Sequence, residues 1–169
     1  MKSKIHECQK SNFRWWGKKQ ILYMLVSVIS LTTVAQTQNK QLTHFNLERK
    51  VALQGYDPVA YFKQGKAVKG KKELTATYEG VTYNFSIAVN KEYFLSNPLR
   101  YQPQFGGWCA YAMGFSGEKV TINPETFKIV DGKLYLFYNA FFNNTLKSWN
   151  KDEANLKSKA AINWKKIIE

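Results

Sequence analysis

The chain has little cysteine, histidine and acid. Its 169 residues include two Cys, two His and 12 Asp and Glu, against 25 Lys and Arg. Two cysteines exclude a disulfide-rich scaffold and a four-cysteine zinc site. The length fits one domain with a core of ordinary size and excludes two full domains with linkers. The formal charge of +13 is typical of nucleic-acid or membrane binders, so we first divide it by segment.

The N-terminal segment carries part of that charge. Six basic residues lie in the first 20 positions and precede an uncharged run at 21–35, which ends in Thr33-Val34-Ala35. This order of basic, apolar and small residues predicts a signal peptide at 1–35. An uncleaved anchor is the alternative, but the run is shorter than the roughly 20 residues that span a bilayer. We therefore expect an exported protein, periplasmic or extracellular, without a stable membrane span after cleavage near Ala35.

Cleavage changes the composition of the working protein. It removes six basic residues and one acid, which leaves 134 residues with 19 Lys and Arg, 11 Asp and Glu, and a charge of +8. One cysteine remains, Cys109, so an intrachain disulfide is excluded. A cluster of lysines at 63–72 has no helix-turn-helix, zinc-finger or RNA-recognition signature beside it. We interpret it as a solvated loop, open to anionic lipid or cell-wall polymer, and expect no nucleic-acid partner.

Two hairpins are predicted from the alternation of apolar and polar residues. The segments 74–78 and 81–85 flank Glu79-Gly80, and the segments 126–130 and 133–138 flank Asp131-Gly132. A polar lead-in at 36–52 precedes the domain, which we place at 53–169. The inward positions of the first hairpin are expected to be Leu74, Ala76, Tyr78, Val81, Tyr83 and Phe85.

Helices are predicted between and after the hairpins. Pro58 suits the start of a short helix, and Asn90 is a candidate cap for a helix in which Tyr93 and Phe94 face inward. A short helix carries Leu146 and Trp149, and the last helix has an apolar stripe at Leu156, Ala160, Trp164 and Ile167 or Ile168. We predict an α+β domain, with a small antiparallel sheet built from hairpins, packed against short helices and a C-terminal helix.

Few residues of the mature chain support catalysis. Cys109 and His44 are its one thiol and one imidazole, and they form the one available nucleophile–base pair. The alternative is that Cys109 is a buried core residue and His44 a surface residue. Gly106-Gly107 allows either an anion contact or a tight turn beside aromatics. An enzyme is therefore the less favoured class.

Aromatic residues offer a candidate pocket. Tyr56, Tyr61, Trp108 and Tyr111 can line a cavity with their polar tips inward, or can belong to the core. Asp57 is the one acid in the aromatic-rich segment at 53–62. It either caps the following helix or presents a carboxylate to a ligand.

Four phrases in order resemble the YHS domain family, in its exported single-domain branch. They are GYDPVAYF at 55–62, YEGVTYNFS at 78–86, NPLRYQPQFGGWCAYAMGFSG at 97–117 and DGKLYLFYN at 131–139. Cysteine-rich members of this family are associated with metal handling. At the positions of their three cysteines this chain has Ala60, Ser86 and Asn90, so that metal chemistry does not carry over.

The resemblance implies a binding module for a small ligand or metal ion of unknown specificity. Its expected ligand site is one shared pocket formed by Tyr56, Asp57, Tyr61, Trp108 and Cys109. The expected metal ligands, for copper, iron or zinc, are Cys109, Asp57 and His44. Two alternatives remain open: a thiol-dependent enzyme or redox protein that uses Cys109, and a structural or interaction protein without a small-molecule site. The oligomeric state is not predicted.

Overall fold

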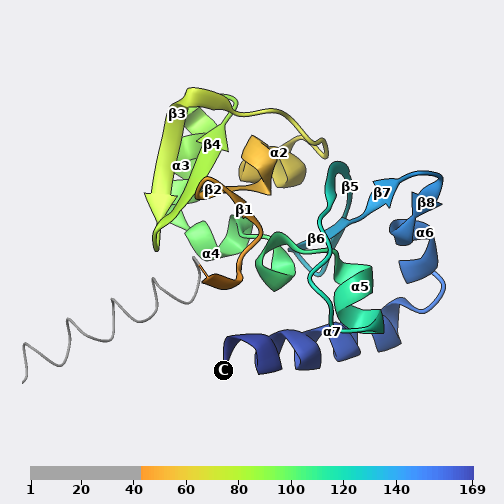
Figure 1. Ribbon diagram of the computed structural model, residues 1–169. Helices are drawn as coiled ribbons and strands as arrows, with labels where there is room; N and C mark the ends of the chain where they lie inside the picture. The colour runs from red at the N-terminus through yellow and green to blue at the C-terminus, as the bar shows by residue number, and fades with distance from the viewer. Residues whose placement is uncertain (1–42) are drawn as a thin grey trace, which may run out of the picture. The chain divides into compact units, whose positions relative to one another are not determined.

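The computed structural model describes residues 43–169, shown in colour in Figure 1. The expected signal peptide at 1–35 and the first part of the lead-in lie outside the described residues. Within residues 43–169, no helix is both long enough and apolar enough to cross a membrane.

The N-terminal half of the described chain contains a four-stranded sheet with helices against it. The sheet has the order β1-β2-β4-β3, and β2 and β4 are its one parallel pair. Two of its strands, β1 and β2, come from the segment that the sequence assigned to the lead-in. The elements are β1 (Leu47–Glu48), β2 (Val51–Ala52), α2 (Pro58–Lys63), β3 (Lys71–Tyr78), β4 (Val81–Phe85), α3 (Ala88–Ser96) and α4 (Pro98–Tyr101).

The C-terminal half contains two hairpins and three helices. The hairpin of Asn123–Val130 and Lys133–Phe137 lies between the four-stranded sheet and the helices of this half. The helix α7 runs along the lower edge of Figure 1, and α5 packs on it. The elements are α5 (Ala110–Phe115), β5 (Asn123–Val130), β6 (Lys133–Phe137), β7 (Asn139–Ala140), β8 (Asn143–Asn144), α6 (Thr145–Trp149) and α7 (Glu153–Ile168). The predicted α+β class, with small antiparallel sheets and a C-terminal helix, is confirmed.

Turn chemistry fixes both predicted hairpins. β3 pairs with β4 across Glu79-Gly80, and β5 pairs with β6 across Asp131-Gly132. All four turn residues have positive φ, from 48° at Glu79 to 81° at Gly80. Such backbone matches the right-handed twist of the strands that it joins. The hairpin positions read from the sequence are therefore correct, and β3 and β5 each extend further toward the N-terminus.

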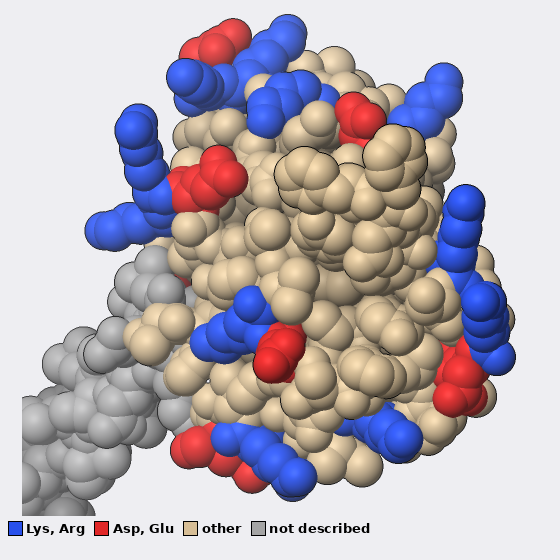
Figure 2. All heavy atoms as spheres, turned by 45° about the vertical axis from the view of Figure 1, so that its right-hand side comes forward, with Lys and Arg blue, Asp and Glu red and all other residues tan. Residues whose placement is uncertain are grey.

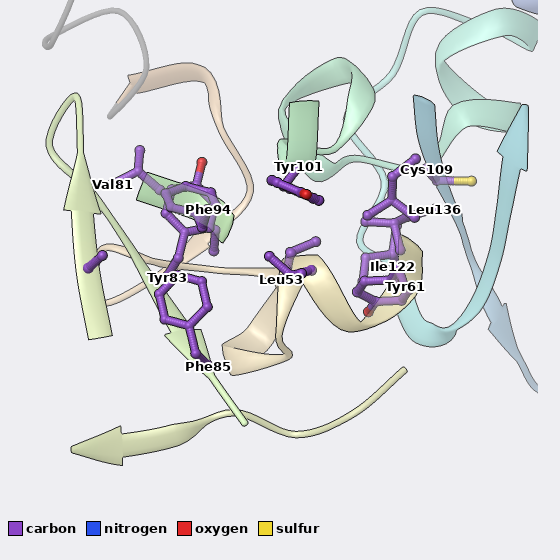
Figure 3. Packing of buried hydrophobic residues seen from close by; sticks show 14 residues of the cluster. Leu53, Tyr61, Val81, Tyr83, Phe85, Phe94, Tyr101, Cys109, Ile122 and Leu136 are labelled. Carbon is purple, nitrogen blue, oxygen red and sulfur yellow. The ribbon is translucent and has the colours of Figure 1, made fainter. Parts of the chain in front are cut away.

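Most of the predicted inward residues are buried. In the first hairpin, Ala76, Val81, Tyr83 and Phe85 belong to the core, whereas Leu74 and Tyr78 are partly buried against it. Figure 3 shows Tyr83 and Phe94 close together, and their ring centroids are 4.5 Å apart.

Helix packing agrees with the sequence pattern at three places. Asp57 caps α2 and Pro58 is its first residue. Asn144 caps α6, and Trp149 at its end is fully buried. Leu156 and Ala160 on α7 are buried, and a Cβ added to Gly114 of α5 would lie 2.5 Å from the carbonyl oxygen of Leu156. Only glycine therefore permits α5 and α7 to approach this closely.

The helix α3 differs from the prediction in two respects. Its N-cap is Ile87, and Asn90 lies inside the helix with its side chain buried. Tyr93 remains 41% exposed, so Phe94 alone of the predicted pair is buried. The sequence suggested a cap because asparagine is common at helix starts. The structure uses the Asn90 amide instead to bind a buried carboxylate.

Candidate functional site

Asp57 is a fully buried carboxylate with five protein donors. Its Oδ1 accepts hydrogen bonds from the backbone N–H groups of Val59 (2.9 Å) and Ala60 (3.3 Å). Its Oδ2 accepts from the Ser86 backbone N–H (2.8 Å), the Ser86 hydroxyl (2.6 Å) and the Asn90 amide (2.7 Å). A buried charge requires such donors to compensate for lost hydration. Asp57 thus joins α2 to the end of β4 and to α3, as the capping alternative requires.

Three positions that the resemblance alone aligns with cysteines, Ala60, Ser86 and Asn90, all contact Asp57. Ala60 donates its backbone N–H, Ser86 donates twice, and Asn90 donates its amide. The Asn90 amide also lies 3.5 Å from the Ser86 hydroxyl. Segments separated by about 30 positions therefore converge on one side chain. In this chain the converged groups are hydrogen-bond donors to one carboxylate.

Tyr56 and Tyr61 lie on either side of Asp57 in sequence but have separate surroundings. The Tyr61 hydroxyl is buried and donates to the carbonyl oxygen of Pro124 at 3.0 Å. Burial raises the pKa of Tyr61 well above its ordinary value. The Tyr56 hydroxyl lies 3.4 Å from a Glu125 carboxylate oxygen, and the Lys69 ammonium is 4.6 Å from the Tyr56 ring centroid. Tyr61 is therefore a core residue, and Tyr56 is part of a polar surface contact.

His44 and Trp108 form a second group. The Trp108 indole N–H donates to the His44 carbonyl oxygen at 2.7 Å, and the Lys119 ammonium lies 3.2 Å from His44 Nδ1. The Lys119 ammonium is also 6.0 Å from the Trp108 ring centroid. Next to this group, Gly106 leaves no room for a Cβ between Phe45 and Trp164. The Gly106-Gly107 pair is thus the tight turn beside aromatics.

Cys109 lies at the N-terminal end of α5, and its side chain is buried. The sulfur accepts a hydrogen bond from the Tyr138 backbone N–H at 3.3 Å and lies 3.4 Å from the Thr145 hydroxyl. That hydroxyl also donates to the Tyr138 carbonyl oxygen at 2.9 Å. Two elements distant in sequence, the end of β6 and the start of α6, therefore hold the thiol in place.

An open pocket of about 320 Å³ lies over Cys109. Its wall includes the side chains of Tyr111 and Phe115, whose rings are stacked with centroids 5.5 Å apart. Phe115 is 71% exposed, so this wall is apolar and accessible. The remaining lining residues are Ala112, Ser116, Glu118, Val120, Tyr138, Asn143 and Thr145.

The turn between β7 and β8, which precedes the pocket residue Asn143 in the sequence, carries two further phenylalanines. Phe141 and Phe142 form the turn between these strands, and both are almost fully exposed. Their φ values of 49° and 63° are unusual for bulky residues. Figure 2 turns this side of the molecule forward and shows charged side chains mainly around the margin of a largely uncharged face.

The five predicted ligand residues do not share one pocket. Of Tyr56, Asp57, Tyr61, Trp108 and Cys109, only Cys109 lines the pocket described above. The sulfur of Cys109 points away from Leu53 and Tyr101 in the core (Figure 3). The resemblance suggested a common pocket because both phrases are rich in aromatics and glycine, but the aromatics serve the core and two surface contacts.

The predicted metal ligands also lie in three different settings. Asp57 is occupied by backbone and side-chain donors, Cys109 is bonded to Tyr138 and Thr145, and His44 lies against Lys119. Within residues 43–169, no three His, Cys, Asp or Glu side chains lie close enough to hold a metal ion. These residues do not fit a copper, iron or zinc site.

A larger cleft of about 780 Å³, not predicted from the sequence, lies beside the four-stranded sheet. Asn84 on β4 lines it, and so do Lys69 and Lys72 of the lysine cluster. A signal was present, because Asn84 stands in the hairpin among buried Tyr83 and Phe85. A polar residue at such a position requires either a protein partner or a ligand.

No family model, no curated protein and no solved structure matches this chain.

Proposed function

We propose that the chain is an exported, YHS-like binding module that holds a small, largely apolar ligand against Cys109. The observation that carries this proposal is the open pocket over the thiol, with its wall of Tyr111 and Phe115. Its volume of about 320 Å³ suits a small molecule. Concave sites with apolar walls and a few polar groups are typical of ligand pockets.

The resemblance to the YHS family is supported by the contacts of Asp57. Ala60, Ser86 and Asn90 were aligned with family cysteines from the sequence phrases alone, and all three donate to the same carboxylate. The Ala60 bond belongs to the cap of α2, whereas Ser86 and Asn90 lie 29 and 33 positions from Asp57 and carry the support. We do not extend the proposal to a metal ion, because the candidate ligands lie in separate settings.

Binding is favoured over catalysis by the partners of the sulfur. Cys109 is bonded to a backbone N–H and a hydroxyl, and neither group is a general base. His44, the candidate base, lies against Lys119 and Trp108.

A thiol-dependent redox role is the second candidate. The observation that favours it is the place of Cys109 in the lining of an open pocket, from which a redox partner can approach the thiol. The complete burial of Cys109 counts against it, since reactive thiols are partly exposed.

Alkylation of the folded chain separates these two functions. In a Cys8→Ser background, Cys109 is the only thiol. Binding predicts slow reaction with iodoacetamide and none with a bulky maleimide until the protein unfolds. Rapid labelling of the folded protein by both reagents would support the redox role instead.

Native mass spectrometry of protein purified from its own compartment tests the ligand itself. We expect a bound small molecule that is lost from Ala112→Phe, which fills the pocket from its wall. The matched control is Ala88→Phe at the exposed start of α3. An adduct retained by Ala112→Phe, or no adduct in the wild type, would contradict the proposed site.

A further inference from the structure

The cleft beside the four-stranded sheet is the largest described here and shares no lining residue with the pocket over Cys109. Its volume of about 780 Å³ lies within the range of small-molecule sites. One wall comes from β3 and β4, and the other from the segment that runs from β1 to Gly55. Its lining residues are Glu48, Arg49, Val51, Gln54, Gly55, Lys69, Gly70, Lys72, Thr75, Thr82 and Asn84.

Asn84 lines this cleft and has a buried, unpaired side-chain oxygen. Its side chain is only 7% exposed, and its Oδ1 has no hydrogen-bond partner within the described residues. Leaving such a group unpaired costs about 1–3 kcal/mol. The other unpaired buried atom of residues 43–169 is the indole nitrogen of Trp149, which lies in the second core against Tyr135 and Phe137. Asn84, unlike Trp149, is a residue that lines a space that a ligand can enter.

The geometry beside Asn84 depends on two glycines. A Cβ on Gly70 would lie 2.6 Å from the Asn84 backbone, so a side chain there would push the two segments apart. A Cβ on Gly55, where φ is +79°, would lie 3.3 Å from the Asn84 amide nitrogen and 3.7 Å from the Lys69 ammonium. The amide and the ammonium therefore lie at the same end of the cleft.

The charge of the cleft is positive. Arg49, Lys69 and Lys72 line it, and Glu48 is the one acid among its lining residues. Lys69 is held in place, because its ammonium donates to the Gln54 carbonyl oxygen at 2.5 Å. An ammonium has three N–H groups, so this bond leaves others for a ligand. Thr75 and Thr82 add hydroxyl groups to the sheet wall.

We infer that this cleft binds a small hydroxylated anion, such as a sugar acid or a sugar phosphate. The anionic group pairs with Lys69 and Lys72, and a ligand hydroxyl hydrogen-bonds to the Asn84 amide. Both features are needed, because the lysines select charge whereas the amide selects a hydroxyl group. This site is independent of the proposed Cys109 pocket, so either can fail without the other.

Isothermal titration calorimetry on the full chain tests the inference with four probes. D-gluconate and D-glucose 6-phosphate carry both the charge and the hydroxyl groups, D-glucose lacks the charge, and inorganic phosphate lacks the carbon-bound hydroxyl groups. We expect the two charged sugars to bind at least about tenfold more tightly than the other two. Equal binding of glucose, equal binding of phosphate, or no binding of either charged sugar at millimolar concentration would overturn the inference. The preferred charged sugar distinguishes a carboxylate from a phosphate ligand.

Two variants locate the binding on the cleft. Asn84→Leu keeps the branched shape and removes the acceptor, and we expect it to weaken binding of the preferred sugar about tenfold. Lys72→Gln is expected to weaken it several-fold, whereas Lys71→Gln, its exposed neighbour outside the cleft lining, is expected to change nothing. If Asn84→Leu does not fold, the comparison of Lys72→Gln with Lys71→Gln decides whether binding occurs in this cleft. Equal affinities of Lys72→Gln and Lys71→Gln would overturn the assignment.

Discussion

Asp57 and Asn84 are two buried polar side chains in the same half of the domain, and their surroundings are opposite. The Asp57 carboxylate has five donors and faces no described cleft. The Asn84 side-chain oxygen has no donor, and Asn84 lines the largest of the described clefts. Hydrogen bonds thus replace the lost hydration of the Asp57 carboxylate, but no hydrogen bond replaces that of the Asn84 side-chain oxygen.

The difference separates a structural polar residue from a functional candidate. A saturated carboxylate has no capacity left for a ligand, whatever its chemistry suggests in the sequence. An unpaired amide in a basic cleft lowers stability unless something outside the protein pairs with it. Four substitutions test this contrast, in decreasing order of expected effect.

Asp57→Asn should have the largest effect. It keeps the shape, but it removes the charge and directs an NH₂ group at donors that need an acceptor. We expect the free energy of unfolding to fall by about 3 kcal/mol, measured by urea denaturation. The control is Asp152→Asn at the exposed start of α7, with a change within about 0.5 kcal/mol. Equal effects of the two variants would contradict the structural role of Asp57.

Ser86→Ala tests one of the five donors. It deletes the hydroxyl that lies 2.6 Å from Asp57 Oδ2 but leaves the backbone donor in place. A hydrogen bond to a charged group contributes about 1.5–3 kcal/mol, so we expect a loss near the lower figure. Ser96→Ala, whose hydroxyl donates to the Tyr93 carbonyl oxygen on the surface, is the matched control. A loss no greater than that of the control would show that the remaining donors compensate.

Asn84→Leu should change stability in the opposite direction. Because it removes an unpaired buried acceptor, we expect the free energy of unfolding of the ligand-free protein to rise by about 1 kcal/mol. Chemical denaturation of the wild type and the variant, side by side, measures this. A clear loss of stability would mean that Asn84 is a structural residue like Asp57.

Tyr61→Phe should have the smallest effect on stability at neutral pH and a distinct effect at alkaline pH. Burial raises its pKa in the folded protein, so the unfolded chain loses this proton first as pH rises above about 10. The stability contribution is complete below that pH and declines above it. Tyr61→Phe should therefore flatten the fall of stability between pH 9 and 11, measured by thermal unfolding. An unchanged alkaline slope would assign the fall to other groups.

Much of the fold could be predicted because its signals are local. The turn pairs Glu79-Gly80 and Asp131-Gly132 fix the hairpins, and the apolar stripe of α7 fixes its buried face. The strands β1 and β2 were missed because each has only two residues, and because β2 joins the sheet by pairing with the distant strand β4. Asn90 was misread because its role depends on a carboxylate 33 positions away.

The candidate sites were harder to predict than the fold. Cys109 was identified from its rarity, and the structure adds a pocket over it. The expected shared pocket failed because aromatic residues pack equally well in a core, as Tyr61 does. The cleft at Asn84 needs the approach of Gly55 and Gly70 to the sheet, which no local pattern expresses.

The position of Asp57 in the chain also constrains the order of folding. Its bonds to Ser86 and Asn90 close loops of 29 and 33 positions, and the whole β3–β4 hairpin lies inside them. Forming that hairpin first shortens the loop that remains to be closed and reduces its entropy cost. We therefore expect the contacts of Asp57 to form late in folding, so that Asp57→Asn accelerates unfolding more than it slows refolding.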